Sequence, residues 1–120
     1  MSNRVLQLAG DAVRKTIEGT DVPVLIDFGA AWCLPCRRQQ PVTEQVARQV
    51  RGRARVCMVD IDGNRGLATR LNIHSIPTLI IFFQAIERER FIGIQSPEIL
   101  IEALNRWALQ PAPTDAHREV

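Results

Sequence analysis

The chain has 120 residues, of which 46% are hydrophobic and 23% charged, and this is typical of one soluble globular domain. The formal charge of +2 is too small to indicate a nucleic-acid partner by itself. The densest group of basic residues, at 48–55, contains no aromatic side chain on which a base could stack, so we expect no nucleic-acid partner. No apolar run approaches the ~20 residues of a membrane span, and the N-terminus lacks a secretory signal. We therefore expect a cytoplasmic protein without a membrane partner.

The predicted elements alternate between strands and helices up to the third helix, and a hairpin and a last helix follow. In chain order they are strand 4–8, helix 10–19, strand 22–30, helix 35–51, strand 54–61, helix 64–73, strand 78–83, strand 88–93 and helix 96–109. This alternation implies parallel strands with crossover helices, then an antiparallel pair. The fold class is therefore α/β, with a central mixed five-stranded sheet flanked by about four helices.

Local patterns support these elements. The run at 22–30 is almost continuously apolar, as expected for a strand that is covered on both faces. The helix at 35–51 is expected to be interrupted by Pro41. In the last helix Ser96 can act as the N-cap. Residues 1–109 form the predicted domain, and 110–120, with two prolines and no apolar period, are expected to be a disordered tail.

Two cysteines lie where the strand at 22–30 gives way to a helix. Positions i and i+3 share a helix face, so the sulfurs of Cys33 and Cys36 can approach bonding distance. Unpaired N–H groups and the helix dipole at the first turn favour a thiolate at Cys33. Cys36 is expected to be more buried and to resolve a mixed disulfide. Arg37 and Arg38 follow directly and add positive potential.

Several segments together resemble the thioredoxin family over roughly residues 4–109. They are "VLIDFGAAWCLPC" with Pro41 downstream, "VDIDGNRGLATRLNIHSIPTLIIF", and Gly93. The resemblance implies the thioredoxin fold and a dithiol–disulfide oxidoreductase that reduces protein disulfides without a cofactor. It also implies a monomer that a thioredoxin-reductase-type electron donor regenerates.

The resemblance implies four catalytic positions. Cys33 is similar to the family's nucleophile and Cys36 to its resolving thiol, and the two form the redox-active disulfide. Asp27 lies in an apolar strand, where burial is expected to raise its pKa and make it a proton acceptor for Cys36. Pro77 resembles the family's cis-proline, which faces the cysteine pair and leaves the backbone of Ile76 available to an extended substrate.

An apolar docking patch around Cys33 is implied as well. Its members are Trp32, Leu34, Pro35, Ile76 and Gly93. The alternative is that Trp32 only packs in the hydrophobic core and does not contact a substrate.

The chain departs from the family pattern at four positions. Leu34 replaces the glycine between the cysteines, and Gly29 replaces the family's second tryptophan. Met58 occupies the place of the lysine that pairs with the buried aspartate. Ala85 replaces the glycine of a tight hairpin, and because alanine resists positive φ, this turn is expected to differ in type or length. Leucine-proline supplies no charge to stabilise a thiolate, so we expect a reducing protein.

Other functions remain open at this point. Cys33, Cys36, Cys57 and His74 add up to a Cys₃His ligand count, which would suit zinc or an iron–sulfur cluster between two chains. A thioredoxin-like fold can also serve as a non-catalytic binding module, or its cysteines can form a permanent structural disulfide. Cys57 itself is expected to be a small core residue, with a regulatory thiol as the alternative.

Overall fold

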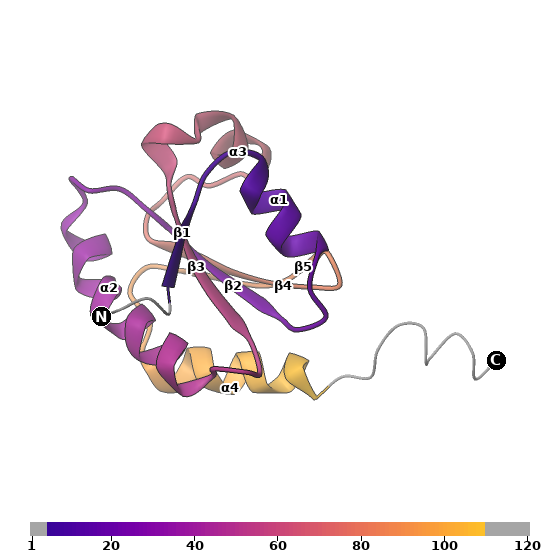
Figure 1. The fold of residues 1–120 in the computed structure, drawn as a ribbon. Coiled ribbons are helices and arrows are strands. Elements are labelled where there is room, and N and C mark those ends of the chain that lie inside the picture. Colours follow the sequence, from indigo (N-terminus) through magenta and orange to yellow (C-terminus); the bar gives the residue numbers. More distant parts are fainter. Residues whose placement is uncertain (1–4, 110–120) are drawn as a thin grey trace.

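The structure is a computed structural model that describes residues 5–109 (Figure 1). The expected disordered tail at 110–120 lies outside the described residues. The elements are β1 (Val5–Leu8), α1 (Asp11–Glu18), β2 (Val24–Gly29), α2 (Leu34–Gln49), β3 (Arg55–Asp60), the 3₁₀ helix η1 (Ile61–Gly63), α3 (Arg65–Arg70), β4 (Thr78–Phe83), β5 (Ile86–Ile92) and α4 (Pro97–Ala108). This order confirms the predicted sequence of strands and helices.

The five strands form one mixed sheet in the order β1-β3-β2-β4-β5. Strands β1 and β2 both run parallel to β3, whereas β4 runs antiparallel to β2, and β5 antiparallel to β4. The predicted mixed five-stranded sheet with four α-helices is confirmed. The charged strand β5 lies at an edge, where its side chains hinder pairing with another chain.

Helices cover both faces of the sheet (Figure 1). On one face α2 and α4 pack over a core that includes Leu25, Val46, Leu79, Leu100 and Leu104. On the other face α1 and α3 cover a second core that includes Val13, Ile26, Phe28, Val59 and Ile80. The central strands are therefore buried on both sides, which explains why they are continuous apolar runs in the sequence.

Strand β2 carries a polar residue into the centre of the molecule. Side chains alternate between the faces of a strand, so Asp27 lies on the same face as Leu25, beneath α2. Only 2% of its surface is exposed. Strand β2 ends at Gly29, and the chain reaches the first turn of α2 within five residues. The cysteines and the buried carboxylate are thus close because one strand leads directly into one helix.

Helix α2 runs through Pro41, and the expected interruption there is wrong. Proline cannot donate the hydrogen bond to the carbonyl of Arg37, four residues earlier. Pro41 is exposed. Its ring and the freed carbonyl can therefore be accommodated on the solvent side of the helix without breaking it.

The hairpin between β4 and β5 also differs from expectation. Phe83 pairs with Ile86, which leaves a two-residue turn. Both turn residues, Gln84 and Ala85, have positive φ, 58° and 66°. This is the pattern of a tight type I′ turn. The expectation that alanine would change the turn is wrong, because the pairing of the two strands imposes the turn on an unfavourable residue.

We expect Ala85→Gly to stabilise the fold by about 0.5–1 kcal/mol, because glycine accepts positive φ without steric cost but loses more chain entropy on folding. Urea unfolding measures this as a higher midpoint. The matched control is Ala12→Gly, at an exposed position within helix α1, which is expected to destabilise by a similar amount. Equal urea midpoints for Ala85→Gly and the parent chain would contradict the expected steric cost of alanine at positive φ.

Candidate active site

The cysteine pair lies at the N-terminus of α2. Cys33 is the N-cap residue, and its Sγ accepts a hydrogen bond from the backbone N–H of Cys36 at 3.2 Å. The two Sγ atoms are bonded as a disulfide, with 5.2 Å between the Cα atoms. Pro35, in the first turn, has no N–H that would need a partner. In the reduced protein the same N–H and the positive end of the helix dipole stabilise a thiolate at Cys33.

Both cysteines are almost fully buried, with 5% of Cys33 and 7% of Cys36 exposed. The expectation that Cys36 would be the more buried one is wrong. The reason is the loop before β4, which covers Cys33 and places the carbonyl oxygen of Ile76 3.8 Å from its Sγ. Access to Cys33 is therefore controlled by a segment more than forty residues further along the chain.

The loop that covers Cys33 contains the expected cis-proline. The Ile76–Pro77 peptide bond is cis. The carbonyl of Pro77 accepts a hydrogen bond from the N–H of Gly93 at 2.8 Å, and Gly93 has a φ of 89°, which favours glycine. The structure therefore brings Ile76, Pro77 and Gly93 together beside Cys33, as the sequence resemblance implies.

Three of the proposed docking residues are exposed next to the cysteine pair. Trp32 is 68% exposed and Leu34 53% exposed, so the core-packing alternative for the tryptophan is wrong. The indole Nε1 of Trp32 donates a hydrogen bond to Asp62 at 2.8 Å, which fixes the orientation of the ring. Pro35 is also exposed, and Ile76 is partly buried against the cysteine pair.

Two further apolar side chains adjoin this patch and were not identified from the sequence. Ile92 and Ile94, on either side of Gly93, are 63% and 50% exposed. Their sequence signal was weak, because apolar residues next to an edge strand are ordinarily assigned to packing. They extend the exposed apolar surface near the cis-proline loop.

Asp27 has no lysine beside it. The residue opposite it on β3 is Met58, as the sequence comparison with the family pattern predicts. The Oγ1 of Thr43, on α2, donates a hydrogen bond to Oδ2 of Asp27 at 2.8 Å. Burial raises the pKa of Asp27 from its ordinary value of 3.8 to about 6, and the bond from Thr43 opposes that rise.

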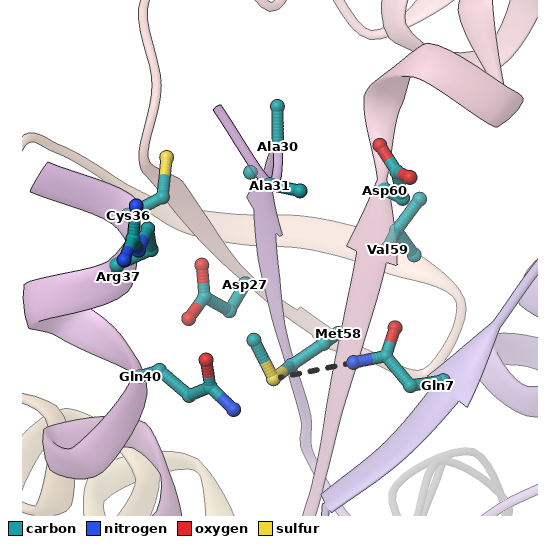
Figure 2. Close-up of a pocket in the computed structure, with 11 residues that line it drawn as sticks. Gln7, Asp27, Ala30, Ala31, Cys36, Arg37, Gln40, Met58, Val59 and Asp60 are labelled. Atoms are coloured by element: carbon teal, nitrogen blue, oxygen red, sulfur yellow. Dashed lines mark hydrogen bonds between the residues drawn. The ribbon is translucent and has the colours of Figure 1, made fainter. Parts of the chain in front are cut away.

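Asp27 and Cys36 line the same pocket, which has a volume of about 220 Å³. Figure 2 shows the carboxylate of Asp27 extending from β2 toward α2, with Cys36 on the first turn of that helix. Gly29 contributes to the pocket at the position where the family pattern has tryptophan. A Cβ atom at Gly29 would lie 3.1 Å from Sγ of Cys36, so the strand and the cysteine approach each other closely. The pocket has room for several water molecules.

Thr43 and Gln39, both fully buried on α2, were not predicted as part of the site. A signal for them exists in the sequence. They precede the buried Val46 by three and seven residues, which places them on the same helix face. Because both side chains are polar, the apolar pattern of the helix does not include them.

The proposed metal ligands are not assembled. Cys57 lies on β3 within the core beneath α1 and α3, and burial raises the pKa of its thiol to about 11. Within residues 5–109, no three histidine, cysteine, aspartate or glutamate side chains are grouped so that they could hold a metal ion. In the same range, no helix combines the length and the apolar character that crossing a membrane requires.

Comparisons with known proteins agree with this geometry. The family model for thioredoxin matches residues 4–106. A thioredoxin of Rickettsia felis is 30% identical over 106 residues, which cover 88% of this chain and 98% of the relative. Thioredoxin 1 of a Nostoc species is 35% identical over 100 residues, covering 83% and 94%.

Solved structures give the same result. A mutant thioredoxin of Halobacterium salinarum superposes with a TM-score of 0.80 at 30% identity, covering 88% of this chain and 93% of the other. The chain therefore belongs to the thioredoxin family, and with its Cys33–Cys36 pair it is a thioredoxin-like dithiol–disulfide oxidoreductase.

Proposed function

We propose that this chain works as a reductant of protein disulfides, with Cys33 as the nucleophile, Cys36 as the resolving thiol and Asp27 as the proton acceptor. The observation that carries the proposal is the shared pocket. In this pocket the buried carboxylate of Asp27, with its raised pKa, lies beside Cys36. Cys36 is in the first turn of α2, and Cys33 is the N-cap of the same helix.

The reaction has two exchange steps. The thiolate of Cys33 attacks one sulfur of the substrate disulfide, and the other substrate sulfur leaves as a thiolate. Cys36 then passes its proton through pocket water to Asp27 and attacks the Cys33 sulfur, which releases the second substrate sulfur. Two electrons have moved to the substrate, and the chain holds the Cys33–Cys36 disulfide until a reductase of the thioredoxin-reductase type restores the dithiol.

The substrate segment docks on the exposed apolar surface around Cys33. Trp32, Leu34 and Pro35 flank Cys33 in the sequence and are exposed, and the cis-proline loop, bonded to Gly93, contacts the Cys33 sulfur. Because Pro77 lacks an N–H, the backbone of Ile76 can pair with an extended chain. Leu34 gives this surface a branched apolar side chain where the family pattern has none.

The direction of electron flow follows from the residues between the cysteines. Leu34 and Pro35 place no charge and no side-chain donor next to the Cys33 sulfur, so the thiolate gains less stabilisation than in a strongly oxidising protein. Equilibration with a mildly oxidising glutathione buffer is expected to leave the pair mostly as the disulfide. A mostly reduced pair would contradict the proposed reducing role.

The proposal includes a monomer that acts in the cytoplasm. The buried free thiol of Cys57 is consistent with a reducing compartment. Relatives of this chain include chloroplastic thioredoxins of rice and spinach, so family membership alone does not fix the compartment. Cell fractionation tests the proposed cytoplasmic location, and recovery of the chain in another compartment would contradict it.

The proposal is tested by insulin-disulfide reduction with dithiothreitol as the electron source. The parent chain is expected to accelerate insulin precipitation, and Cys33→Ser is expected to reduce the rate to that of dithiothreitol alone. The matched control is Cys57→Ala, which removes a cysteine in the core beneath α1 and α3, separate from the cysteine pair, and is expected to retain the activity. Equal activity of Cys33→Ser and the parent chain would instead favour a non-catalytic binding module.

A further inference from the structure

A line of hydrogen bonds leads from Gln95, two residues after Gly93 of the docking patch, through two fully buried side chains to Asp27. The backbone N–H of Gln95 donates to Oε1 of Gln39 at 2.8 Å. Nε2 of Gln39 donates to Oγ1 of Thr43 at 3.3 Å, and Oγ1 of Thr43 donates to Oδ2 of Asp27 at 2.8 Å. Gln39 and Thr43 have no exposed surface, and within residues 5–109 no buried side-chain nitrogen or oxygen lacks a partner.

The direction of every bond in this line is determined by its chemistry. A backbone N–H can only donate, so the oxygen of the Gln39 amide must face Gln95 and its NH₂ group must face Thr43. An NH₂ group also only donates, so the hydroxyl of Thr43 receives that bond and its own hydrogen is left for Asp27. Three successive donors therefore point toward one carboxylate, and such a chain strengthens each of its bonds.

We propose that Gln39 and Thr43 are positioning residues that hold the Asp27 carboxylate ready to accept the proton of Cys36, and that they tie it to the Gly93–Gln95 segment of the docking surface. The proposal rests on the role of Asp27 in the proposed function. Gln95 lies two residues after Gly93, whose N–H binds the carbonyl of Pro77. The base and the substrate-binding backbone thus share one hydrogen-bonded structure.

The hydroxyl of Thr43 donates a hydrogen bond directly to the carboxylate of Asp27. A hydrogen bond to the charged form favours that form, whereas burial disfavours it. Neither neighbouring strand places a side-chain N–H or O–H donor opposite Asp27 that could replace this bond. On the neighbouring strands the residues opposite it are Met58 and Leu79.

Three ionisable groups share the pocket with Asp27. They are Cys36 and Arg37 from α2 and Asp60 from β3. Gln7 and Gln40 line the pocket without charge, and Nε2 of Gln7 donates to the sulfur of Met58 at 3.7 Å (Figure 2). Of the contacts described, only the bond from Thr43 reaches a carboxylate oxygen of Asp27 directly.

The test compares Thr43→Val with Thr43→Ser in the full chain. Valine keeps the shape of threonine and removes the hydroxyl, whereas serine keeps the hydroxyl. The titration of the Asp27 carboxyl carbon is followed by NMR in both redox states. Thr43→Val is expected to move the midpoint upward by about one pH unit, the effect of losing one hydrogen bond to a charged group, and Thr43→Ser is expected to titrate as the parent chain.

Gln39→Leu is the second variant. Without the amide, the hydroxyl of Thr43 is no longer directed to the carboxylate, so the midpoint is expected to rise by a smaller amount than in Thr43→Val. The resolving step, followed as release of substrate thiol from a preformed mixed disulfide, is expected to shift its pH dependence in the same direction. Introducing Thr43→Val into an Asp27→Asn background is expected to leave that pH dependence unchanged.

The proposal is overturned if Asp27 in Thr43→Val titrates with the same midpoint as in Thr43→Ser and in the parent chain. It is also overturned if Thr43→Val still shifts the pH dependence when Asp27 is asparagine. Thr43→Ala gives the same titration readout if the valine variant does not fold. Because the titration requires no substrate, it remains readable even if the chain fails to reduce insulin, and the two proposals can fail separately.

Discussion

Cys36→Ser is expected to retain attack on a substrate disulfide but to stop after it, so that covalent complexes between Cys33 and the substrate accumulate. In the parent chain Cys36, the proposed resolving thiol, lies one helical turn from Cys33 and is therefore held next to a mixed disulfide at Cys33. A well-oriented intramolecular group acts as if it were present at very high concentration, far above the millimolar thiol in solution. We therefore expect resolution to slow by more than about 10³-fold.

The complexes are detected as species of higher mass on non-reducing gels, which disappear when a reductant is added. Cys33→Ser in the same experiment is expected to form none, since it lacks the attacking thiolate. The double variant Cys36→Ser with Cys57→Ala is expected to form as many complexes as Cys36→Ser alone. Loss of the complexes in that double variant would mean that the buried Cys57 captures the substrate, which contradicts the assignment of Cys33.

Most of the sheet could be predicted from the sequence because its central strands are buried on both faces. Such strands appear as uninterrupted apolar runs, and strand β4 was found with its bounds at Thr78 and Phe83. The place of Asp27 opposite Met58 was also predictable, since a family pattern specifies pairs of positions that meet across neighbouring strands. Both predictions depend on short-range patterns or on a known fold.

The remaining features depend on contacts between distant segments. Gln39 is buried because its amide bonds the backbone of Gln95, 56 residues later, and no local pattern contains that partner. Cys33 is as buried as Cys36 because the loop at Ile76 covers it. Similarly, the turn at Ala85 follows from the register of two strands, which overrides the preference of a single residue.

Asp27→Asn is expected to make the protein more stable at neutral pH and also slower. The folded state raises the pKa of Asp27 from 3.8 to about 6, so it holds the proton that the unfolded chain releases. Stability from this group is therefore fully present below pH 3.8 and is lost as the pH rises to about 6. The difference between the two pKa values corresponds to about 3 kcal/mol of free energy of unfolding.

Urea unfolding of the oxidised proteins from pH 4 to pH 8 measures this effect, because the bonded cysteines do not titrate in that form. The parent chain is expected to lose stability relative to Asp27→Asn as the pH rises across this range. At pH 8 the free energy of unfolding of the variant is expected to be higher by up to about 3 kcal/mol. Ionisable groups elsewhere, such as Glu87, cancel in the difference between the two proteins. A difference that does not change with pH would contradict the buried, titrating carboxylate.

The same substitution is expected to lower the reaction rate, although it raises the stability. Without the carboxylate, Cys36 must lose its proton to water, and we expect the resolving step at pH 7 to slow by about 10²-fold, as for the loss of a general base. The rate deficit should shrink toward pH 9, where hydroxide in solution can take the thiol proton in place of Asp27, and this convergence separates lost proton transfer from a distorted site. A variant that is more stable and slower, with rates that converge at high pH, would show that the chain keeps a destabilising buried charge because the reaction uses it.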